Sequence, residues 1–293
     1  MKKQIILSAV GGDGRQFFIT KLLEQKGFKI RRYGIVADDI SDINTEKTLE
    51  DALSGTNYLL LPVPVTKDGY RLNLGEDILI SELVKKIDHS CCVFGGKIPP
   101  SIKDMLESNG IKYYDYFDDT AYVWQNADIT AEGAIYLLMR ELDITLRDSK
   151  ILVCGYGRIG KCLSKKLKDL GADVTVAARK REDIMLAEVC GNTHTDELSY
   201  RRAGIFDLDR SYDAVLNTVP SWIFDASNTS IVHDSIYIEL ASAPYGGEVE
   251  FMKKNCRKYI MGSALPGKYA PLSAARAVFR SLLEFLEKED DEN

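Results

Sequence analysis

The segment SKILVCGYGRIGKCLSKKLKDLGADVTVAARKRED, residues 149–183, carries the strongest structural signal in this chain. An apolar run, KILVC, leads into three glycines spaced as GxGxxG, namely Gly155, Gly157 and Gly160. A helical stretch and a second apolar run, DVTVA, follow. This order predicts a βαβ unit that binds a dinucleotide, in which the three glycines permit a tight turn, close approach of a pyrophosphate and close helix packing.

The turn and the start of its helix are the predicted phosphate site. The free N–H groups at a helix N-terminus favour an anion, so we expect the cofactor phosphates to lie there. The residues predicted to contact the cofactor at this turn are Gly155, Tyr156, Gly157, Arg158, Ile159 and Gly160.

The end of the second strand favours NADP over NAD. A carboxylate that binds the ribose 2′-hydroxyl is expected there, about twenty residues after the turn. Ala178 occupies this position, and Arg179, Lys180 and Arg181 follow it. The missing carboxylate removes repulsion of a 2′-phosphate, and Arg179, with Lys180 beside it, can bind that group. A solvated helix start explains Lys180 and Arg181 equally well, but not the missing acid.

Two later strands end in loops that we expect beside the nicotinamide half of the cofactor. The segments NTVPSW (217–222) and ELASAPYGG (239–247) follow buried strands, and ligands of open α/β sheets lie beyond the carboxyl ends of strands. Thr218 and Pro220 are therefore predicted cofactor contacts. For Pro220, simple termination of the strand is the alternative.

The whole chain reads as α/β, with two Rossmann-like, doubly wound parallel-sheet domains joined by a linker helix. Strand-like and helix-like segments alternate before residue 128 and resume at residue 149. Thr130 is the expected cap of the intervening helix, and a long amphipathic helix ends the chain and is expected to pack at the domain junction. The predicted boundaries are 1–128 for a substrate domain, 129–148 for the linker helix, 149–270 for the NADP domain and 271–293 for the C-terminal helix.

Cations that follow predicted strands are the candidate substrate ligands. Arg15 (GGDGRQ), Lys67 (PVPVTKDG) and Lys97 (FGGK) follow strands of the first half, and Lys268 (LPGKYAP) precedes the last helix. Such a set suits a substrate with more than one carboxylate, although each could be an ordinary surface cation. Asp13 is a candidate base, and shaping of the GGDGR turn is its alternative role.

Composition excludes several classes of function. The formal net charge of −6 and the pI near 5.3 argue against nucleic acid as a partner. No apolar run is long enough for a membrane span, and the N-terminus is a poor signal peptide, so a cytoplasmic location is expected. The six cysteines and three histidines show no metal-ligand spacing, and no metal is predicted.

Several segments together resemble the family of dipicolinate synthase A subunits of spore-forming bacteria. The similarity runs over nearly the whole chain, and more distantly the two-domain plan is similar to alanine dehydrogenase and the D-2-hydroxyacid dehydrogenases. The segments that carry it are SAVGGDGRQ, LLPVPVTKDG, VFGGKIPP, VCGYGRIG, VTVAARK, LNTVP, ELASAPYGG and ALPGKYAP.

The resemblance implies an NADP-dependent oxidoreductase that converts dihydrodipicolinate, from the lysine branch, into dipicolinate during sporulation. It also implies a flavoprotein-like partner, the B subunit of dipicolinate synthase, and we expect the chain to form a homo-oligomer. Within this interpretation Arg15 is the carboxylate clamp, and Lys97 or Lys268 is the second clamp or proton acceptor. The alternatives are an NADP-dependent amino- or hydroxy-acid dehydrogenase and a non-catalytic nucleotide-binding subunit. Simple 2-hydroxyacid oxidation is disfavoured because Lys268 stands where those dehydrogenases carry a histidine.

Overall fold

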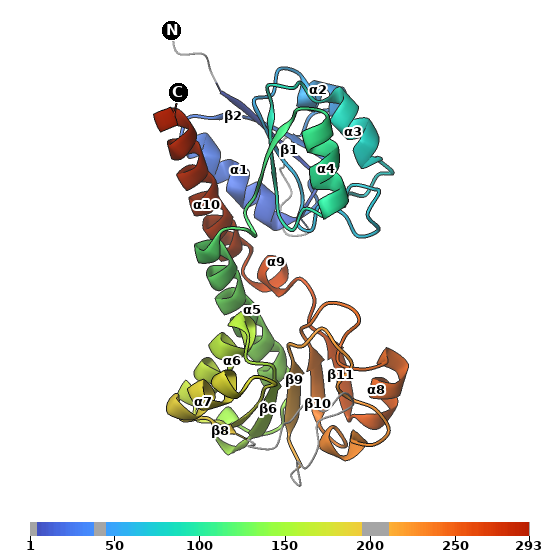
Figure 1. Cartoon of the computed structure of the whole chain (residues 1–293), viewed down its shortest axis with the longest axis vertical. Helices are drawn as coiled ribbons and strands as arrows, with labels where there is room; N and C mark the ends of the chain where they lie inside the picture. Colours follow the sequence, from blue (N-terminus) through green and yellow to red (C-terminus); the bar gives the residue numbers. More distant parts are fainter. Residues whose placement is uncertain (1–4, 38–44, 195–210, 293) are drawn as a thin grey trace. The chain divides into compact units, whose positions relative to one another are not determined.

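The computed structural model describes residues 5–37, 45–194 and 211–292, and the chain divides into two compact units. The first unit contains residues 1–126 and 270–293, and the second contains residues 127–269. Each unit is built on its own parallel sheet, and each is described separately below (Figure 1). The predicted fold class, α/β with two Rossmann-like parallel sheets, is confirmed.

The sheet of the first unit has five parallel strands in the order β2-β1-β3-β4-β5. The chain order reverses between β1 and β3, and the ligand of such a sheet is expected beyond the carboxyl ends of these two strands. The strands are β1 (Ile6–Val10), β2 (Lys29–Tyr33), β3 (Tyr58–Leu60), β4 (Cys92–Gly95) and β5 (Lys112–Asp115). The helices are α1 (Gly14–Gln25), α2 (Leu49–Leu53), α3 (Ile80–Lys86), α4 (Pro100–Ser108), the first part of α5 (Thr120–Glu141) and α10 (Pro271–Glu292).

Helices cover both faces of this sheet, as Figure 1 shows. On one face, α2, α3 and α4 pack apolar side chains such as Leu83 and Leu106 against Leu59 and Val93 of the strands. On the other face, α1 and α10 close the core around Leu7 and Phe94. Because both faces are covered, the strands read as continuous apolar runs and not as alternating ones.

The sheet of the second unit has six parallel strands in the order β11-β10-β9-β6-β7-β8. With β6 counted as the first strand, this is the 3-2-1-4-5-6 order of dinucleotide-binding sheets, and its reversal lies between β6 and β9. The strands are β6 (Lys150–Cys154), β7 (Asp173–Ala177), β8 (Thr193–His194), β9 (Ala214–Asn217), β10 (Ile236–Glu239) and β11 (Lys258–Met261). The helices are the second part of α5, α6 (Arg158–Asp169), α7 (Arg181–Val189), α8 (Val249–Asn255), α9 (Leu265–Tyr269) and two 3-10 turns, Leu146–Asp148 and Thr229–Ile231.

The second sheet is also covered on both faces. Ile135 and Leu138 of α5 and Leu163 and Leu167 of α6 pack on one face. On the opposite face, Met252 of α8 joins a core that contains Leu152 and Tyr237. The second unit therefore has the three-layer arrangement that the GxGxxG segment predicts.

Helix α5 begins nine residues before the predicted start at residue 129. Thr130 lies inside the helix and does not cap it, because α5 starts at Thr120. The Asp119 carboxylate accepts a 2.8 Å hydrogen bond from the N–H of Ala121, and Tyr122 is buried in the first unit. These contacts allow the first turns to form in a segment, DDTAYVWQN, whose sequence lacks a clear apolar stripe.

Among the residues that the structure describes, no helix has the length and apolar content needed to cross a membrane. The six cysteines are all unpaired.

Candidate functional site

The glycine turn after β6 has the geometry that a phosphate site needs. Gly155 has a φ of 93°, which a residue with a side chain rarely adopts. A Cβ on Gly160 would lie 2.1 Å from the Gly155 carbonyl oxygen, so only glycine lets α6 approach the strand this closely. By contrast, nothing lies within 4 Å of the Cβ position of Gly157, where the backbone is open.

Helix α6 begins directly at this turn. Its N-cap is Gly157, which has no side chain to bond the first N–H groups. The N-terminus of this 12-residue helix is therefore available to an anion, with the positive end of the helix dipole facing it. Arg158 is exposed at the start of the helix, and Ile159 is half-buried.

A pocket of about 340 Å³ lies at the carboxyl ends of β6, β7 and β9, where the strand order reverses. The residues that line it come from the glycine turn, the end of β7 and the loop after β9: Gly155, Tyr156, Ala178, Arg179, Lys180, Asp183, Val219, Pro220 and Ser221. Five of these, Gly155, Tyr156, Arg179, Lys180 and Pro220, are predicted cofactor contacts. The other predicted contacts at the turn, Gly157, Arg158, Ile159 and Gly160, are outside this lining.

The end of β7 presents cations to the pocket. Ala178 is buried, and the exposed side chains of Arg179 and Lys180 follow it. The pocket also has one carboxylate, Asp183 of α7, which forms a 3.3 Å ion pair with Lys161 of α6. This pair offsets the negative charge of Asp183, so the rim keeps a net attraction for a phosphate.

Tyr156 lies in the pocket wall with its ring in the core. Its side chain is 5% exposed, and Lys161 lies over the ring with its Nζ atom 5.4 Å from the ring centroid. Burial, together with a hydrogen bond to Cys190, raises the pKa of Tyr156 to about 12, so the phenol stays neutral. Tyr156 therefore anchors the glycine turn to the core by packing.

Thr218 fixes the loop after β9 to the glycine turn. Its Oγ1 atom donates a 2.8 Å hydrogen bond to the carbonyl of Cys154 and occupies the space beside Gly155. The position of Pro220 follows from this attachment, because the loop leaves the sheet directly after Thr218.

A buried carboxylate, which the sequence analysis missed, organises the loops after β9 and β10. Glu239 is 1% exposed and accepts four hydrogen bonds, each between 2.8 and 3.0 Å long. The donors are the side chains of Asn217 and Tyr237 and the backbone N–H groups of Ala241 and Gly246. Burial raises the pKa of Glu239 above its ordinary value, although these hydrogen bonds oppose the shift.

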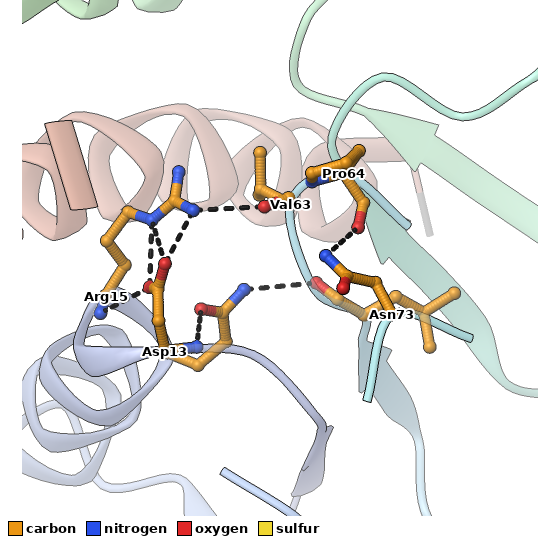
Figure 2. Close-up of polar contacts among 7 residues, drawn as sticks. Asp13, Arg15, Val63, Pro64 and Asn73 are labelled. Atoms are coloured by element: carbon orange, nitrogen blue, oxygen red, sulfur yellow. Dashed lines mark hydrogen bonds and ion pairs between the residues drawn. The ribbon is translucent and has the colours of Figure 1, made fainter. Parts of the chain in front are cut away.

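In the first unit, Arg15 and Asp13 bind one another at the carboxyl end of β1 (Figure 2). The Nη2 atom of Arg15 lies 2.7 Å from Oδ2 of Asp13, and Nε lies 2.9 Å from Oδ1. Nη2 also donates a 3.0 Å hydrogen bond to the carbonyl of Val63, which follows β3. Arg15 is only 6% exposed, so it links the two strands at which the order of this sheet reverses.

The Asp13 carboxylate also caps helix α1. It accepts a 3.0 Å hydrogen bond from the N–H of Arg15, and the Gln16 side chain bonds back to the N–H of Asp13. Burial acts to raise the pKa of Asp13, but the charge and hydrogen bonds of Arg15 outweigh it and leave the pKa below its ordinary value. A weakly basic carboxylate that is bound to Arg15 and to the start of α1 suits the turn-shaping role better than the role of a general base.

The same edge of the sheet is held by Asn73. Its Nδ2 atom donates a 3.1 Å hydrogen bond to the carbonyl of Pro64, and Gln16 reaches the carbonyl of Leu61 at 3.4 Å (Figure 2). Nothing in the local sequence marks Asn73, because its partner is a backbone carbonyl nine residues away.

The lysine candidates are exposed. Lys67 and Lys97 follow β3 and β4 and so share the carboxyl edge of the first sheet with Arg15, whereas Lys268 lies on α9 of the second unit. Over residues 5–37, 45–194 and 211–292, no group of three or more His, Cys, Asp or Glu side chains is arranged to hold a metal ion.

Comparisons with known proteins agree with this architecture. Residues 7–117 match the family model that describes the N-terminal domain of the dipicolinate synthase A subunit. The A subunit of dipicolinate synthase from Bacillus subtilis (strain 168) is 26% identical over 96% of this chain and 95% of its own length. The crystal structure of the dipicolinate synthase A chain from Bacillus subtilis superposes with a TM-score of 0.79 at 24% identity and covers 100% of this chain and 99% of that one.

A more distant likeness extends to a dehydrogenase. The NAD-complexed D-isomer specific 2-hydroxyacid dehydrogenase of Lactobacillus delbrueckii ssp. bulgaricus shares the fold, with a TM-score of 0.53 at 11% identity over 97% of this chain and 98% of that one. At this identity the likeness shows the fold alone. The matched N-terminal domain and the similarity over nearly the full length relate this chain to the dipicolinate synthase A subunits.

Proposed function

We propose that this chain is an NADP-dependent oxidoreductase that oxidises dihydrodipicolinate to dipicolinate during sporulation, as a branch from lysine biosynthesis. The observation that carries the proposal is the pocket at the β6–β9 reversal, with Ala178 where an NAD enzyme would place a carboxylate and Arg179 and Lys180 directly after it. Similarity to the dipicolinate synthase A subunits suggests the substrate class.

The residues present fit a dinucleotide with a 2′-phosphate. The open backbone at Gly157 and the uncapped start of α6 suit the pyrophosphate, and Arg179 suits the 2′-phosphate. When bound, NADP accepts the hydride that leaves the substrate. The chain itself supplies the phosphate contacts, and the Glu239 network fixes the loops that carry Pro220 and Ala241.

The proposed substrate carries two carboxylates, so the protein needs cations to bind it. Oxidation of the dihydropyridine ring removes one hydride and one proton, and both carboxylates of the substrate remain. Exposed cations at strand ends, Lys97 above all, are the proposed carboxylate ligands, with Lys268 as the candidate from the second unit. Because the product ring is aromatic, the main task of the protein is to hold the ring in position.

We propose that the chain works with a flavoprotein-like B subunit and forms a homo-oligomer. We place it in the cytoplasm, where its unpaired cysteines stay reduced.

The test is NADPH formation, followed at 340 nm, from dihydrodipicolinate by the purified chain with and without the B subunit. NADPH formation that depends on NADP and falls at least tenfold in Lys97→Ala or Lys268→Ala supports the proposal. Turnover of an amino or hydroxy acid without a partner would instead favour a different dehydrogenase. Tight NADPH binding without turnover in either setting would favour a non-catalytic nucleotide-binding role.

A further inference from the structure

The backbone of Lys97 is strained. Its φ is 61°, in the left-handed region where a side chain other than that of glycine is disfavoured. Two glycines, Gly95 at the end of β4 and Gly96 after it, directly precede Lys97, and a Cβ on either would clash with a neighbouring side chain, so the sequence already uses glycine where packing demands it. A glycine at position 97 would remove the strain, and the lysine side chain is therefore present at some expense of stability. Strain of this kind is typical of functional sites.

A buried carboxylate holds this strained turn in place. Asp115, at the end of β5, is 5% exposed, and its two oxygens accept hydrogen bonds from consecutive N–H groups, 2.9 Å from Lys97 and 2.8 Å from Ile98. A third bond, 3.0 Å long, comes from the N–H of Phe117. The register of the sheet accounts for this contact, because Gly95 of β4 pairs directly with Asp115 of β5.

The charge of Asp115 is balanced by a residue other than Lys97. The Nζ atom of Lys103 lies 3.4 Å from the Asp115 carboxylate and 3.1 Å from that of Asp118. The Lys97 side chain is exposed, and among the described residues no acceptor is paired with its ammonium group. The carboxylate therefore fixes the Lys97 backbone and leaves the Lys97 ammonium available.

Arg15, unlike Lys97, does not present an available cation to solvent. Its Nε and Nη2 atoms are bound by Asp13 and by the carbonyl of Val63, and its side chain is nearly buried. Of these two cations at the carboxyl edge of the first sheet, Lys97 is the one presented to solvent on a fixed backbone.

From the strain, the buried carboxylate and the available ammonium together, we propose that Asp115 is a positioning residue that aims Lys97 at a carboxylate of the substrate. The inference rests on the proposed function and adds to it a division of roles. Lys97 makes the contact with the anion, and Asp115 acts only through Lys97.

The experiment compares four variants of the full chain: Lys97→Gly, Lys97→Ala, Asp115→Asn and the double variant Asp115→Asn/Lys97→Gly. Calorimetric titration with dipicolinate measures the anion contact, and NADPH fluorescence reports the second unit separately. Lys85→Ala, which removes one exposed lysine of helix α3 in the same unit, is the matched control.

Both Lys97 variants should weaken dipicolinate binding roughly 10-fold or more, since a charged hydrogen bond is lost. Lys97→Gly should melt about 2 to 4 °C above Lys97→Ala, because only glycine relieves the left-handed strain. Asp115→Asn should weaken dipicolinate binding when Lys97 is present and cause no further loss when glycine replaces it. NADPH binding should stay unchanged in all four variants.

Wild-type affinity for dipicolinate in Lys97→Gly would overturn the inference and leave the proposed function standing. An equal effect of Asp115→Asn in both backgrounds would overturn the positioning role, because Asp115 would then act on the fold alone. A wild-type chain that binds NADPH but neither binds dipicolinate nor forms NADPH from dihydrodipicolinate would overturn the proposed function together with the inference.

Discussion

The side-chain amide of Asn217 donates a 2.8 Å hydrogen bond to the buried carboxylate of Glu239 and so joins the ends of β9 and β10. The same carboxylate holds the N–H groups of Ala241 and Gly246, and the two loops beyond these strands therefore depend on one side chain. One of the loops lines the pocket through Val219, Pro220 and Ser221, so damage to Glu239 should reach the cofactor site.

Replacement of Glu239 by Gln should destabilise the second unit. The four partners of Glu239 all donate to it, and an amide NH₂ group in place of one carboxylate oxygen would leave at least one buried N–H group without an acceptor. The expected loss is about 1 to 3 kcal/mol in the free energy of unfolding, measured by urea denaturation. The variant should also bind NADPH more weakly. An unchanged unfolding midpoint would show that the loops do not depend on this carboxylate.

The loss of stability in Glu239→Gln should depend on pH in a direction that the pKa of Glu239 determines. The pKa of Glu239 is raised in the folded state, chiefly by burial. Its contribution to stability is therefore fully present below the ordinary glutamic acid pKa and is lost as the pH rises through the folded value. The stability difference between wild type and Glu239→Gln should shrink as the pH rises from about 4 towards neutrality. A difference that widens over this range would contradict the raised pKa.

Arg179 should distinguish NADP from NAD. We expect Arg179→Ala to weaken NADP(H) binding by about 1 to 3 kcal/mol, roughly 5-fold to 150-fold, because a charged hydrogen bond to the 2′-phosphate is lost. The affinity for NAD(H) should change little. Arg181→Ala is the matched control, because Arg181 is exposed but does not line the pocket. Equal loss for both cofactors would show that Arg179 does not contact a 2′-phosphate.

The sequence predicts the fold because its signals are local. The GxGxxG turn and the apolar runs on either side identify β6, α6 and β7 without knowledge of the rest of the chain. The start of α5 is different, because Asp119 caps it in a segment that shows no apolar periodicity. The sequence signal of β11 is also weak: its strand KYIM lies at the edge of the sheet, with exposed ends and a half-buried centre.

The candidate site is less visible in the sequence than the fold. Glu239 and Asp115 bond mainly to backbone N–H groups of loops, and such partners leave no motif in the sequence. Arg15 and Asp13 are both candidates from the sequence. The sequence alone does not tell whether Arg15 binds the carboxylate two residues away or a ligand. The structure adds their mutual hydrogen bonds and the link to Val63.

The second and third glycines of the motif should respond differently to replacement by alanine. Gly160→Ala places a Cβ 2.1 Å from the Gly155 carbonyl, so α6 must move away from β6, at a cost of about 1 to 3 kcal/mol in stability. Gly157→Ala meets nothing within 4 Å, so the unfolding midpoint should stay close to that of wild type while NADPH affinity falls. Thermal unfolding and NADPH fluorescence separate the two effects. A Gly157→Ala chain with full NADPH affinity would argue against phosphate contact at this turn.

Arg15→Ala should show how much the Arg15–Asp13 pair contributes to the stability of the protein. The variant removes the hydrogen bonds of the guanidinium to Asp13 and to the Val63 carbonyl, and we expect a loss of about 2 kcal/mol in stability near neutral pH. The pKa of Asp13 lies below its ordinary value because Arg15 outweighs the effect of burial, so this stability is present above the ordinary aspartate pKa of 3.8 and is lost as the pH falls through the folded value. The gap between wild type and Arg15→Ala should therefore narrow below about pH 4, measured by urea denaturation across that range. If the gap stays constant down to about pH 2, the Asp13 carboxylate is not the partner that stabilises Arg15.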